Sequence, residues 1–295
     1  MNKLSVQSLV KNYTIETTIR QADSVSRFDD IVAFGTRVYV PHTPSTDFRE
    51  TVALAARLRR EGMEPVPHLV ARRIEGLAAL DGFLARLSGD AGVAQVLIVA
   101  GDTPRPAGQF DSSLQILDSG LLDKYGIRTV GVAGHPEGHR EVAEPVLRDA
   151  LRRKNAYAEK TGAAVYIVTQ FTFSADPVVA WERSHGADIG RLPVTVGLPG
   201  LATARTLLKY AIECGVGASL QAFSKQYASF AKLLTVSAPD RAIVALARHR
   251  EQAPETRING VHFFTFGGFK KTAAWANKIV AGNFAITEHG GLKVD

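Results

Sequence analysis

Cysteine is almost absent from this chain of 295 residues, because it occurs only as Cys214. A single cysteine excludes an internal disulfide bond and a metal site built from several cysteines. Long apolar runs are missing too, since stretches such as 96–100 are far shorter than the roughly 18 residues of a membrane helix. The first residues hold neither a long apolar core nor a small-residue cleavage site, so no signal peptide is expected. We therefore expect a cytoplasmic protein without a membrane partner.

Common nucleotide-binding and hydrolase motifs are missing as well. No G-x-G-x-x-G follows a predicted strand, and neither a P-loop nor G-x-S-x-G occurs. The formal net charge is +6, and short basic runs at 57–60, 72–73 and 152–154 lie on or beside predicted helices. We interpret these runs as solvated helix faces, with an anionic small ligand as the alternative. Nucleic acid is not an expected partner, because no stripe of basic and aromatic residues is present.

Short β-branched runs alternate with longer helical stretches along the chain. Strands are predicted over 13–18, 37–41, 65–70, 95–101, 127–133, 164–170, 193–198 and 260–266. Helices are predicted over 47–61, 75–87, 112–124, 141–160, 176–184, 202–214 and 270–281. This alternation predicts parallel strands with right-handed crossovers. A repeat of about 30 residues favours a closed (β/α)8 barrel over an open doubly wound sheet.

The barrel is predicted to be one domain over residues 1–295, because no Pro/Gly/Ser-rich linker interrupts the chain. A helical elaboration is expected at 220–250, before the eighth strand. Ser45-Thr46-Asp47 is a typical helix start. Four glycines are expected to end helices in the left-handed conformation: Gly62, Gly126, Gly162 and Gly215.

Polar residues stand at the ends of several predicted strands, where barrel enzymes carry their chemistry. Glu16 lies within an apolar run. A carboxylate in a barrel mouth is costly to ionise, so Glu16 could donate a proton, unless it forms a structural ion pair. Asp102 follows the fourth strand in a Gly-Asp-Thr-Pro sequence that also suits a turn or helix cap. The amide of Gln170 offers one donor and one acceptor to a planar heterocycle. Together they indicate a pocket for a polar, ring-shaped ligand.

Histidines also gather near these strand ends, at His42, His68, His135 and His139. They lack the spacing of a metal site, and Pro136 lies between the last two, so no metal is expected. We interpret them as hydrogen-bonded groups or ligand contacts.

The strand-end stretches together resemble the methylenetetrahydrofolate reductase family. The matching stretches occur in the family's order across residues 13–280: Thr14-Ile15-Glu16, Pro67-His68-Leu69, Gly101-Asp102-Thr103-Pro104, Pro136-Glu137-Gly138-His139, Thr169-Gln170-Phe171 and His262-Phe263-Phe264-Thr265. The resemblance implies a (β/α)8 enzyme that reduces 5,10-methylenetetrahydrofolate to 5-methyltetrahydrofolate. It implies NAD(P)H as the hydride donor, with NADH favoured, and FAD as the usual cofactor.

The resemblance also implies roles for individual residues. Glu16 resembles the acid that opens the folate's imidazolidine ring, and Asp102 the aspartate that hydrogen-bonds the pterin. Gln170, Phe264, Tyr210 and Lys270 are the implied substrate-binding residues, with Lys270 a candidate for the glutamate tail. The implied cofactor contacts are His68, His135, His139 and Asn155.

Two departures from the family pattern bear on the flavin. The family's Arg-Gly-Asp is Ala100-Gly101-Asp102 here, and its basic pair on the fifth helix corresponds to Ala158-Glu159. These changes remove the guanidinium and ammonium donors that hold a pyrophosphate. Our hypothesis is that hydride passes directly from the reduced nicotinamide to the folate.

Other functions remain open at this point. One alternative is a barrel methyltransferase or lyase that uses a folate, and another is a non-catalytic folate-binding protein. The oligomeric state, monomer or homo-oligomer, is also open.

Overall fold

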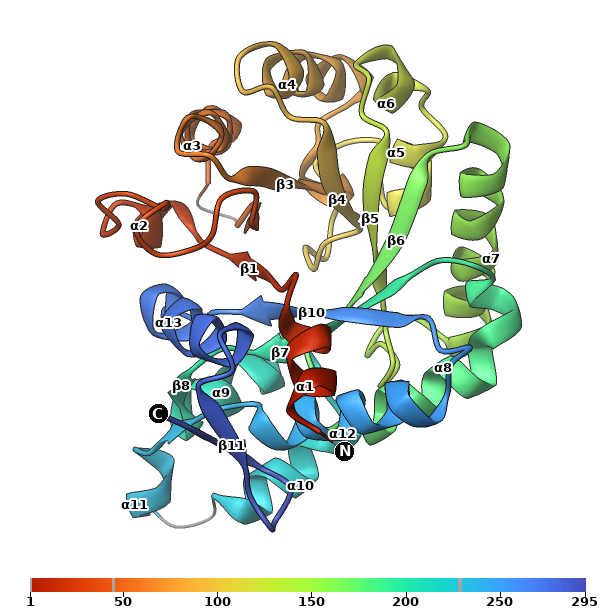
Figure 1. Cartoon of the computed structure of the whole chain (residues 1–295). Coiled ribbons are helices and arrows are strands. Elements are labelled where there is room, and N and C mark those ends of the chain that lie inside the picture. The colour runs from red at the N-terminus through yellow and green to blue at the C-terminus, as the bar shows by residue number, and fades with distance from the viewer. Residues whose placement is uncertain (1, 44–45, 228–229) are drawn as a thin grey trace. The chain divides into compact units, whose positions relative to one another are not determined.

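The computed structural model describes residues 2–43, 46–227 and 230–295. Eight strands close into a barrel in the order β1-β10-β7-β6-β5-β4-β3-β2 (Figure 1). Their bounds are β1 Thr14–Glu16, β2 Arg37–Val40, β3 Glu64–Val70, β4 Gln95–Val99, β5 Thr129–Gly134, β6 Ala164–Thr169, β7 Val194–Pro199 and β10 Ile258–Phe264. Each overlaps one predicted strand, and neighbours such as β2 and β3 run parallel. The predicted (β/α)8 barrel is confirmed.

The barrel strands are buried because side chains fill the interior and helices cover the outside. All six residues of β7 are buried, as are the first four of β4. Strands buried on both faces have near-continuous apolar runs, so a polar residue at a strand end stands out. This is why the strand-end residues were visible in the sequence.

The helices lie mostly where the sequence predicts them. They are α1 Lys3–Val10, α2 Ile19–Ala22, α3 Phe48–Arg60, α4 Leu77–Gly89, α5 Ser113–Leu117, α6 Leu121–Lys124, α7 Glu144–Thr161, α8 Asp176–Ile189, α9 Ala204–Glu213, α10 Ala218–Gln226, α11 Phe230–Leu233, α12 Asp240–Gln252 and α13 Phe269–Val280. A 3-10 turn, η1, spans Ala71–Arg73. Two short strand pairs, β8 (Ala202–Thr203) with β9 (Val236–Ser237) and β11 (Phe284–Ile286) with β12 (Leu292–Val294), lie outside the barrel.

Of the expected helix start Ser45-Thr46-Asp47, Ser45 lies outside the described residues, and Asp47 is confirmed as the cap of α3. Asp47 caps α3 by accepting from Arg49 N at 2.8 Å, while Glu50 Oε2 accepts from Asp47 N at 2.9 Å, which completes a capping box. All four glycines predicted to end helices have positive φ. The helix predicted over 112–124 is instead two short helices, α5 and α6, because Gly120 between them adopts φ +73°.

The chain divides into two compact units. Unit 1 comprises residues 1–15, 134–149 and 168–295, and unit 2 comprises 16–133 and 150–167. In unit 1, the unpredicted helix α1 packs against α12 and α13, and Gln7 Nε2 donates to Val280 O at 3.0 Å. The predicted elaboration at 220–250 contains most of α10, all of α11 and most of α12.

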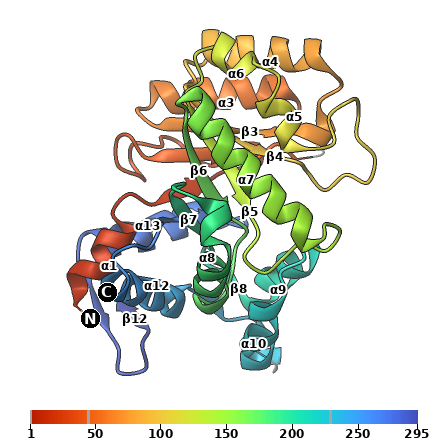
Figure 2. The same ribbon diagram turned by 90° about the vertical axis from the view of Figure 1, so that its right-hand side faces the viewer.

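Two buried tyrosines of unit 2 are joined by a hydrogen bond among the barrel strands. The hydroxyls of Tyr39 and Tyr166 lie 2.7 Å apart, and both side chains are buried. A Cβ atom at Gly131 would lie 3.0 Å from the Tyr166 hydroxyl, so the glycine makes room for that ring. From residue 150 onward, α7 covers β5 and β6 (Figure 2).

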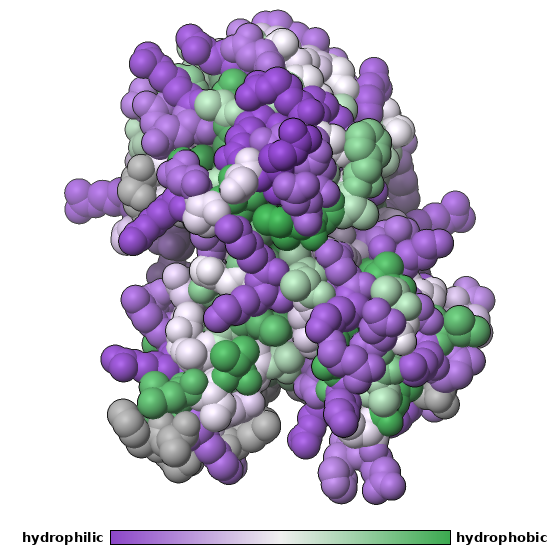
Figure 3. Space-filling model, turned by 60° about the vertical axis from the view of Figure 1, so that its left-hand side comes forward, coloured by the Kyte–Doolittle hydropathy of each residue, from purple (hydrophilic) through white to green (hydrophobic). Residues whose placement is uncertain are grey.

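The face drawn in Figure 3 is mostly polar, and its apolar side chains are scattered in small groups. Among the residues that the structure describes, no helix has both the length and the apolar content needed to cross a bilayer.

Candidate active site

In unit 2, three of the predicted site residues stand at or near the carboxyl ends of their strands. Glu16 is the last residue of β1 and is half-buried. His68 lies in β3, and its ring contacts the ring of Tyr39 edge-on, with centroids 6.0 Å apart. Asp102 follows β4 and is 87% exposed at the side chain. The acids therefore differ in environment, since Glu16 is partly withdrawn from water and Asp102 faces it.

Asp102 is bound by an arginine that the sequence analysis did not assign to the site. Arg73 Nη2 donates to Asp102 Oδ1 at 3.0 Å, and Arg73 Nη1 donates to His42 O at 2.6 Å. The side chain of the neighbouring Arg72 binds the backbone of the loop after β4, because its Nε donates to Thr103 O at 2.7 Å. The interpretation of residues 72–73 as a solvated helix face is wrong for Arg73, which is only 12% exposed.

His42 follows β2 and lies beside Arg73. Burial and then the positive charge of Arg73 lower the pKa of His42, while Asp47 opposes the shift. Both effects favour the neutral imidazole. Its Nδ1 atom is buried and makes no hydrogen bond within the part of the chain that the structure describes. A buried, unsatisfied polar atom is typical of a position where water or a ligand binds.

Helix α7 carries the predicted cofactor contact Asn155. Its amide Nδ2 donates to Glu159 Oε1 at 3.0 Å, one turn further along the helix. The preceding residue, Lys154, is 4% exposed and donates from Nζ to Ala133 O at 2.8 Å. Burial lowers the pKa of Lys154 to about 8. The interpretation of residues 152–154 as a solvated face is therefore wrong for Lys154.

In unit 1, three predicted substrate residues lie around Phe171. Phe264 lies against this buried ring, with centroids 5.9 Å apart, and the ring directly follows Gln170. Tyr210 packs against the cluster that Phe171 forms with Ala211 and Val216. The side chain of Gln170 donates to the Cys214 carbonyl. A Cβ atom at residue 197 would lie 2.6 Å from the Phe264 ring and 2.3 Å from the carbonyl oxygen of residue 169, so only glycine allows this packing.

Phe266 adds a backbone signal to this aromatic cluster. It has φ +45°, the one positive φ of a non-glycine residue in the described ranges. This conformation costs about 1–2 kcal/mol and persists where packing enforces it. Here Phe266 stacks on Tyr210 with ring centroids 4.5 Å apart. Such local strain is found most often at ligand sites.

The other predicted residues of unit 1 are two histidines and a lysine outside this aromatic cluster. His135 and His139 contact each other edge-on, with centroids 5.2 Å apart, and His139 Nδ1 accepts from Glu141 N at 3.1 Å. Lys270 is exposed in the first turn of α13. Within residues 2–43, 46–227 and 230–295, no three His, Cys, Asp or Glu side chains are grouped closely enough to hold a metal ion.

Glu137, which lies between the two histidines, ties three elements of unit 1 together. Its carboxylate accepts from Thr172 Oγ1 at 2.8 Å, from Ser219 Oγ at 2.6 Å and from Ser219 N at 2.9 Å. These bonds connect the segments after β5 and β6 with the first turn of α10. One carboxylate therefore contributes three hydrogen bonds to the anchoring of α10.

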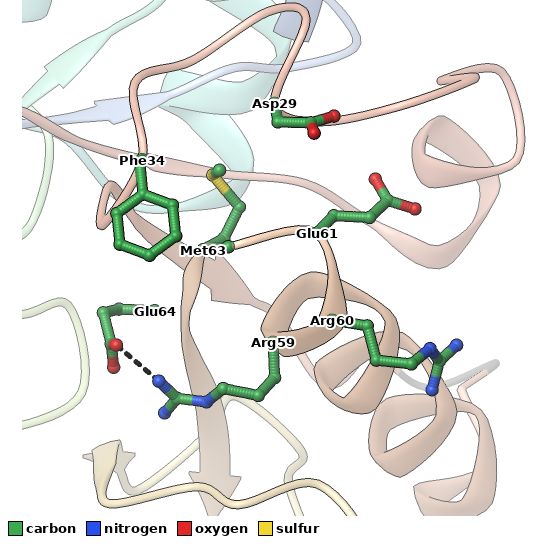
Figure 4. Close-up of a pocket in the computed structure, with 8 residues that line it drawn as sticks. Asp29, Phe34, Arg59, Arg60, Glu61, Met63 and Glu64 are labelled. Atoms are coloured by element: carbon green, nitrogen blue, oxygen red, sulfur yellow. Dashed lines mark hydrogen bonds and ion pairs between the residues drawn. The ribbon is translucent and has the colours of Figure 1, made fainter.

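A hollow of about 300 Å³ lies at the opposite, amino-terminal end of β3 (Figure 4). Its lining includes Phe34, which is 88% exposed, and five charged residues. Arg59 binds Glu64, and Glu61 Oε1 accepts from Arg57 Nε at 2.8 Å. The hollow is separate from the strand-end residues, and four of its charged groups form ion pairs within the protein: Asp29, Arg59, Glu61 and Glu64.

The chain is similar to solved structures across most of its length. An uncharacterized protein from Clostridium thermocellum, described as binding two copies of 5-methyl-5,6,7,8-tetrahydrofolic acid, matches with a TM-score of 0.56 and 10% identity. That match covers 93% of this chain and 98% of the other, and at this identity it shows the fold alone. A conserved Enterococcus faecalis protein of unknown function matches with a TM-score of 0.49 and 11% identity, over 92% of this chain and 66% of that one.

The family comparison covers most of the barrel. Residues 22–274 match the family described as Methylenetetrahydrofolate reductase. The match spans β2 to β10 and includes Asp102, Gln170 and Phe264. The strand-end motifs in the sequence and the closed barrel agree with it. The chain therefore belongs to the methylenetetrahydrofolate reductase family.

Proposed function

We propose that this protein reduces 5,10-methylenetetrahydrofolate to 5-methyltetrahydrofolate with a hydride from NAD(P)H, NADH being favoured, and without a resident flavin. The family match over residues 22–274 carries the proposal. Two further observations support it. Glu16 and Asp102 stand at the carboxyl ends of β1 and β4, where barrel enzymes carry their chemistry. The C. thermocellum structure is described with 5-methyltetrahydrofolic acid, the product of this reaction.

The proposed reaction consumes one proton and one hydride. Protonated Glu16 would donate to a nitrogen of the substrate's five-membered ring, and the bond between that nitrogen and the bridging carbon would break with its electron pair left on nitrogen. The bridging carbon then remains on the other ring nitrogen as a cationic iminium. Hydride addition converts it to a methyl group and leaves NAD⁺. Asp102, bound by Arg73, would stabilise the cation through its negative charge.

Residues 158–159 of α7 do not fit a flavin pyrophosphate. Where typical members have a basic pair, this chain has Ala158-Glu159. The Glu159 carboxylate is bound to Asn155 Nδ2 at 3.0 Å, so a negative charge occupies this part of the helix. A carboxylate repels phosphate oxygens, whereas guanidinium and ammonium groups bind them. Direct transfer then requires the nicotinamide carbon to approach the iminium carbon within about 3–3.5 Å.

An anaerobic assay of NADH oxidation with methylenetetrahydrofolate, with and without added FAD, tests the proposal. We expect turnover without FAD and no flavin absorbance at about 450 nm in the purified protein. Flavin absorbance that is stoichiometric and required for turnover would contradict the flavin-free part alone. No folate-dependent NADH oxidation under either condition would contradict the reductase.

Substitution of Glu16 tests the proton donor. Glu16→Gln should lower kcat by at least about 100-fold, because an amide cannot supply the proton, while folate affinity changes by less than about threefold. Glu64→Gln is the matched control, since Glu64 lies at the opposite end of a barrel strand and is partly exposed. Equal activity of the Glu16→Gln variant and the wild type would remove Glu16 from the mechanism.

The C. thermocellum description favours a second candidate function, folate binding without redox chemistry. A binding protein would take up 5-methyltetrahydrofolate but oxidise no NADH. A folate-dependent methyltransferase or lyase would also leave NADH unchanged, but it would convert the folate in the presence of a second substrate.

A further inference from the structure

We propose that Arg73 is the positioning residue for Asp102. The two side chains differ strongly in exposure, 12% for Arg73 and 87% for Asp102, although they are joined by a 3.0 Å hydrogen bond from Nη2 to Oδ1. The segment Ala100-Gly101 before Asp102 carries no charge of its own. The cation beside Asp102 therefore comes from the segment after β3. The guanidinium of Arg73 is largely buried, and it holds the exposed carboxylate of Asp102 where a ligand can reach it.

Arg73 is fixed by the backbone around it. It is the last residue of η1, directly after β3, and its Nη1 donates to His42 O at 2.6 Å. The guanidinium thereby connects the segment after β2 with the segment after β4. A largely buried guanidinium that is hydrogen-bonded on two sides has little freedom to move, because losing either bond would leave a charged donor unsatisfied.

The contact to Asp102 uses only part of the available edge of the guanidinium. Nε and Nη2 form the edge that holds a carboxylate by two bonds. Arg27 binds Asp29 in this way, through both atoms. In Arg73, Nε is buried and has no hydrogen-bond partner in the described part of the chain. Asp102 is thus held at one point and stays open to a ligand.

Arg72 provides a matched control. It holds the same loop, but through the backbone, by donating to Thr103 O at 2.7 Å and Pro104 O at 2.8 Å. Removing Arg72 should loosen the loop and leave the cation beside Asp102 in place. Removing Arg73 should free the carboxylate. The two substitutions therefore separate loop stability from carboxylate positioning.

The kinetic test rests on the proposed reductase function. Arg73→Gln should lower kcat at least tenfold and leave KM for NADH within about twofold. Arg73→Lys keeps the charge, so its loss in log kcat should be at most half of the loss in Arg73→Gln. Arg72→Gln should change kcat by less than threefold. In an Asp102→Asn background, adding Arg73→Gln should lower kcat by less than a further twofold, because the carboxylate that Arg73 binds is already lost. Additive effects, or equal losses from Arg72→Gln and Arg73→Gln, would overturn the inference.

A second readout is independent of folate chemistry. Crystal structures of the wild type and of the Arg73→Gln variant should differ at the Asp102 side chain, which is displaced or disordered only in the variant. An Asp102 that keeps its position without Arg73 would overturn the inference. If Asp102 moves but the wild type oxidises no NADH, the positioning role stands and the proposed reductase function fails.

Discussion

Lys154 buries an amine within the barrel wall, and its removal should make the protein more stable at neutral pH. Burial lowers its pKa from 10.5 to about 8. At about 1.4 kcal/mol per pKa unit, holding this lysine protonated in the folded state costs about 3.5 kcal/mol. The hydrogen bond from Nζ to Ala133 O offsets about 1 kcal/mol of this cost. Lys154→Met keeps the length of the side chain, so we expect a gain of about 2.5 kcal/mol at pH 7.

The sign of the pH dependence follows from the lowered pKa. Below pH 8, Lys154 is protonated in both the folded and the unfolded state, and the cost of burying the charge is fully present. Between about pH 8 and 10.5 the unfolded chain binds the extra proton, so the stability of the wild type rises with pH relative to the variant. The advantage of Lys154→Met should therefore shrink to near zero by about pH 10.

Urea denaturation at pH 7 and pH 10, followed by the fluorescence of Trp181 and Trp275, measures both quantities. Lys160→Met is the matched control, because Lys160 lies on the same helix and is exposed. It should change the free energy of unfolding by less than about 0.5 kcal/mol at either pH. A Lys154→Met variant that is less stable than the wild type at pH 7, or a difference that is the same at both pH values, would refute the reasoning.

Two further predictions concern the other clusters. Glu137→Ala removes three hydrogen bonds, so it should lower the free energy of unfolding by about 2–3 kcal/mol and speed hydrogen exchange in α10. The control Glu141→Ala, at an exposed position nearby, should do neither. Unchanged exchange in α10 would show that Glu137 does not anchor it. The double change Ala158→Arg and Glu159→Lys should raise the affinity for FAD at least tenfold by fluorescence titration, with Glu141→Lys as the charge control; no gain over that control would show that these two positions do not decide flavin binding.

The fold was predictable because its signal is local and repeated. Each β-branched run followed by an amphipathic stretch carries its own period, and parallel strands buried on both faces leave few alternatives. Helix boundaries depend on finer detail. The stretch 112–124 has a helical pattern, but Gly120 takes a left-handed conformation and divides it into α5 and α6. α1 was missed because its apolar face is buried only against α12 and α13, far along the chain.

The site was only partly predictable, for a related physical reason. The strand-end position of Glu16, Asp102 and Gln170 follows from chain order alone. The partners of the basic residues do not, because Arg73 reaches His42 O and Asp102, about 30 residues away on either side. A run of arginines has the same sequence pattern whether its side chains are solvated or bind distant carbonyl groups. Only the exposure and hydrogen bonds in the folded structure distinguish the two cases.

The basic residues near the proposed site bear on how tightly a dinucleotide can bind. Arg72 donates to loop carbonyls, Arg73 to Asp102 and Lys154 to Ala133 O, so these cations are engaged within the protein despite the net charge of +6. A pyrophosphate that recruited one of them would break a bond that the fold uses. A cofactor that stays bound for many turnovers needs strong phosphate contacts, whereas a nicotinamide that must leave after each hydride transfer does not. In the proposed mechanism, this engagement is compatible with a dinucleotide that is used as a substrate and leaves after each turnover.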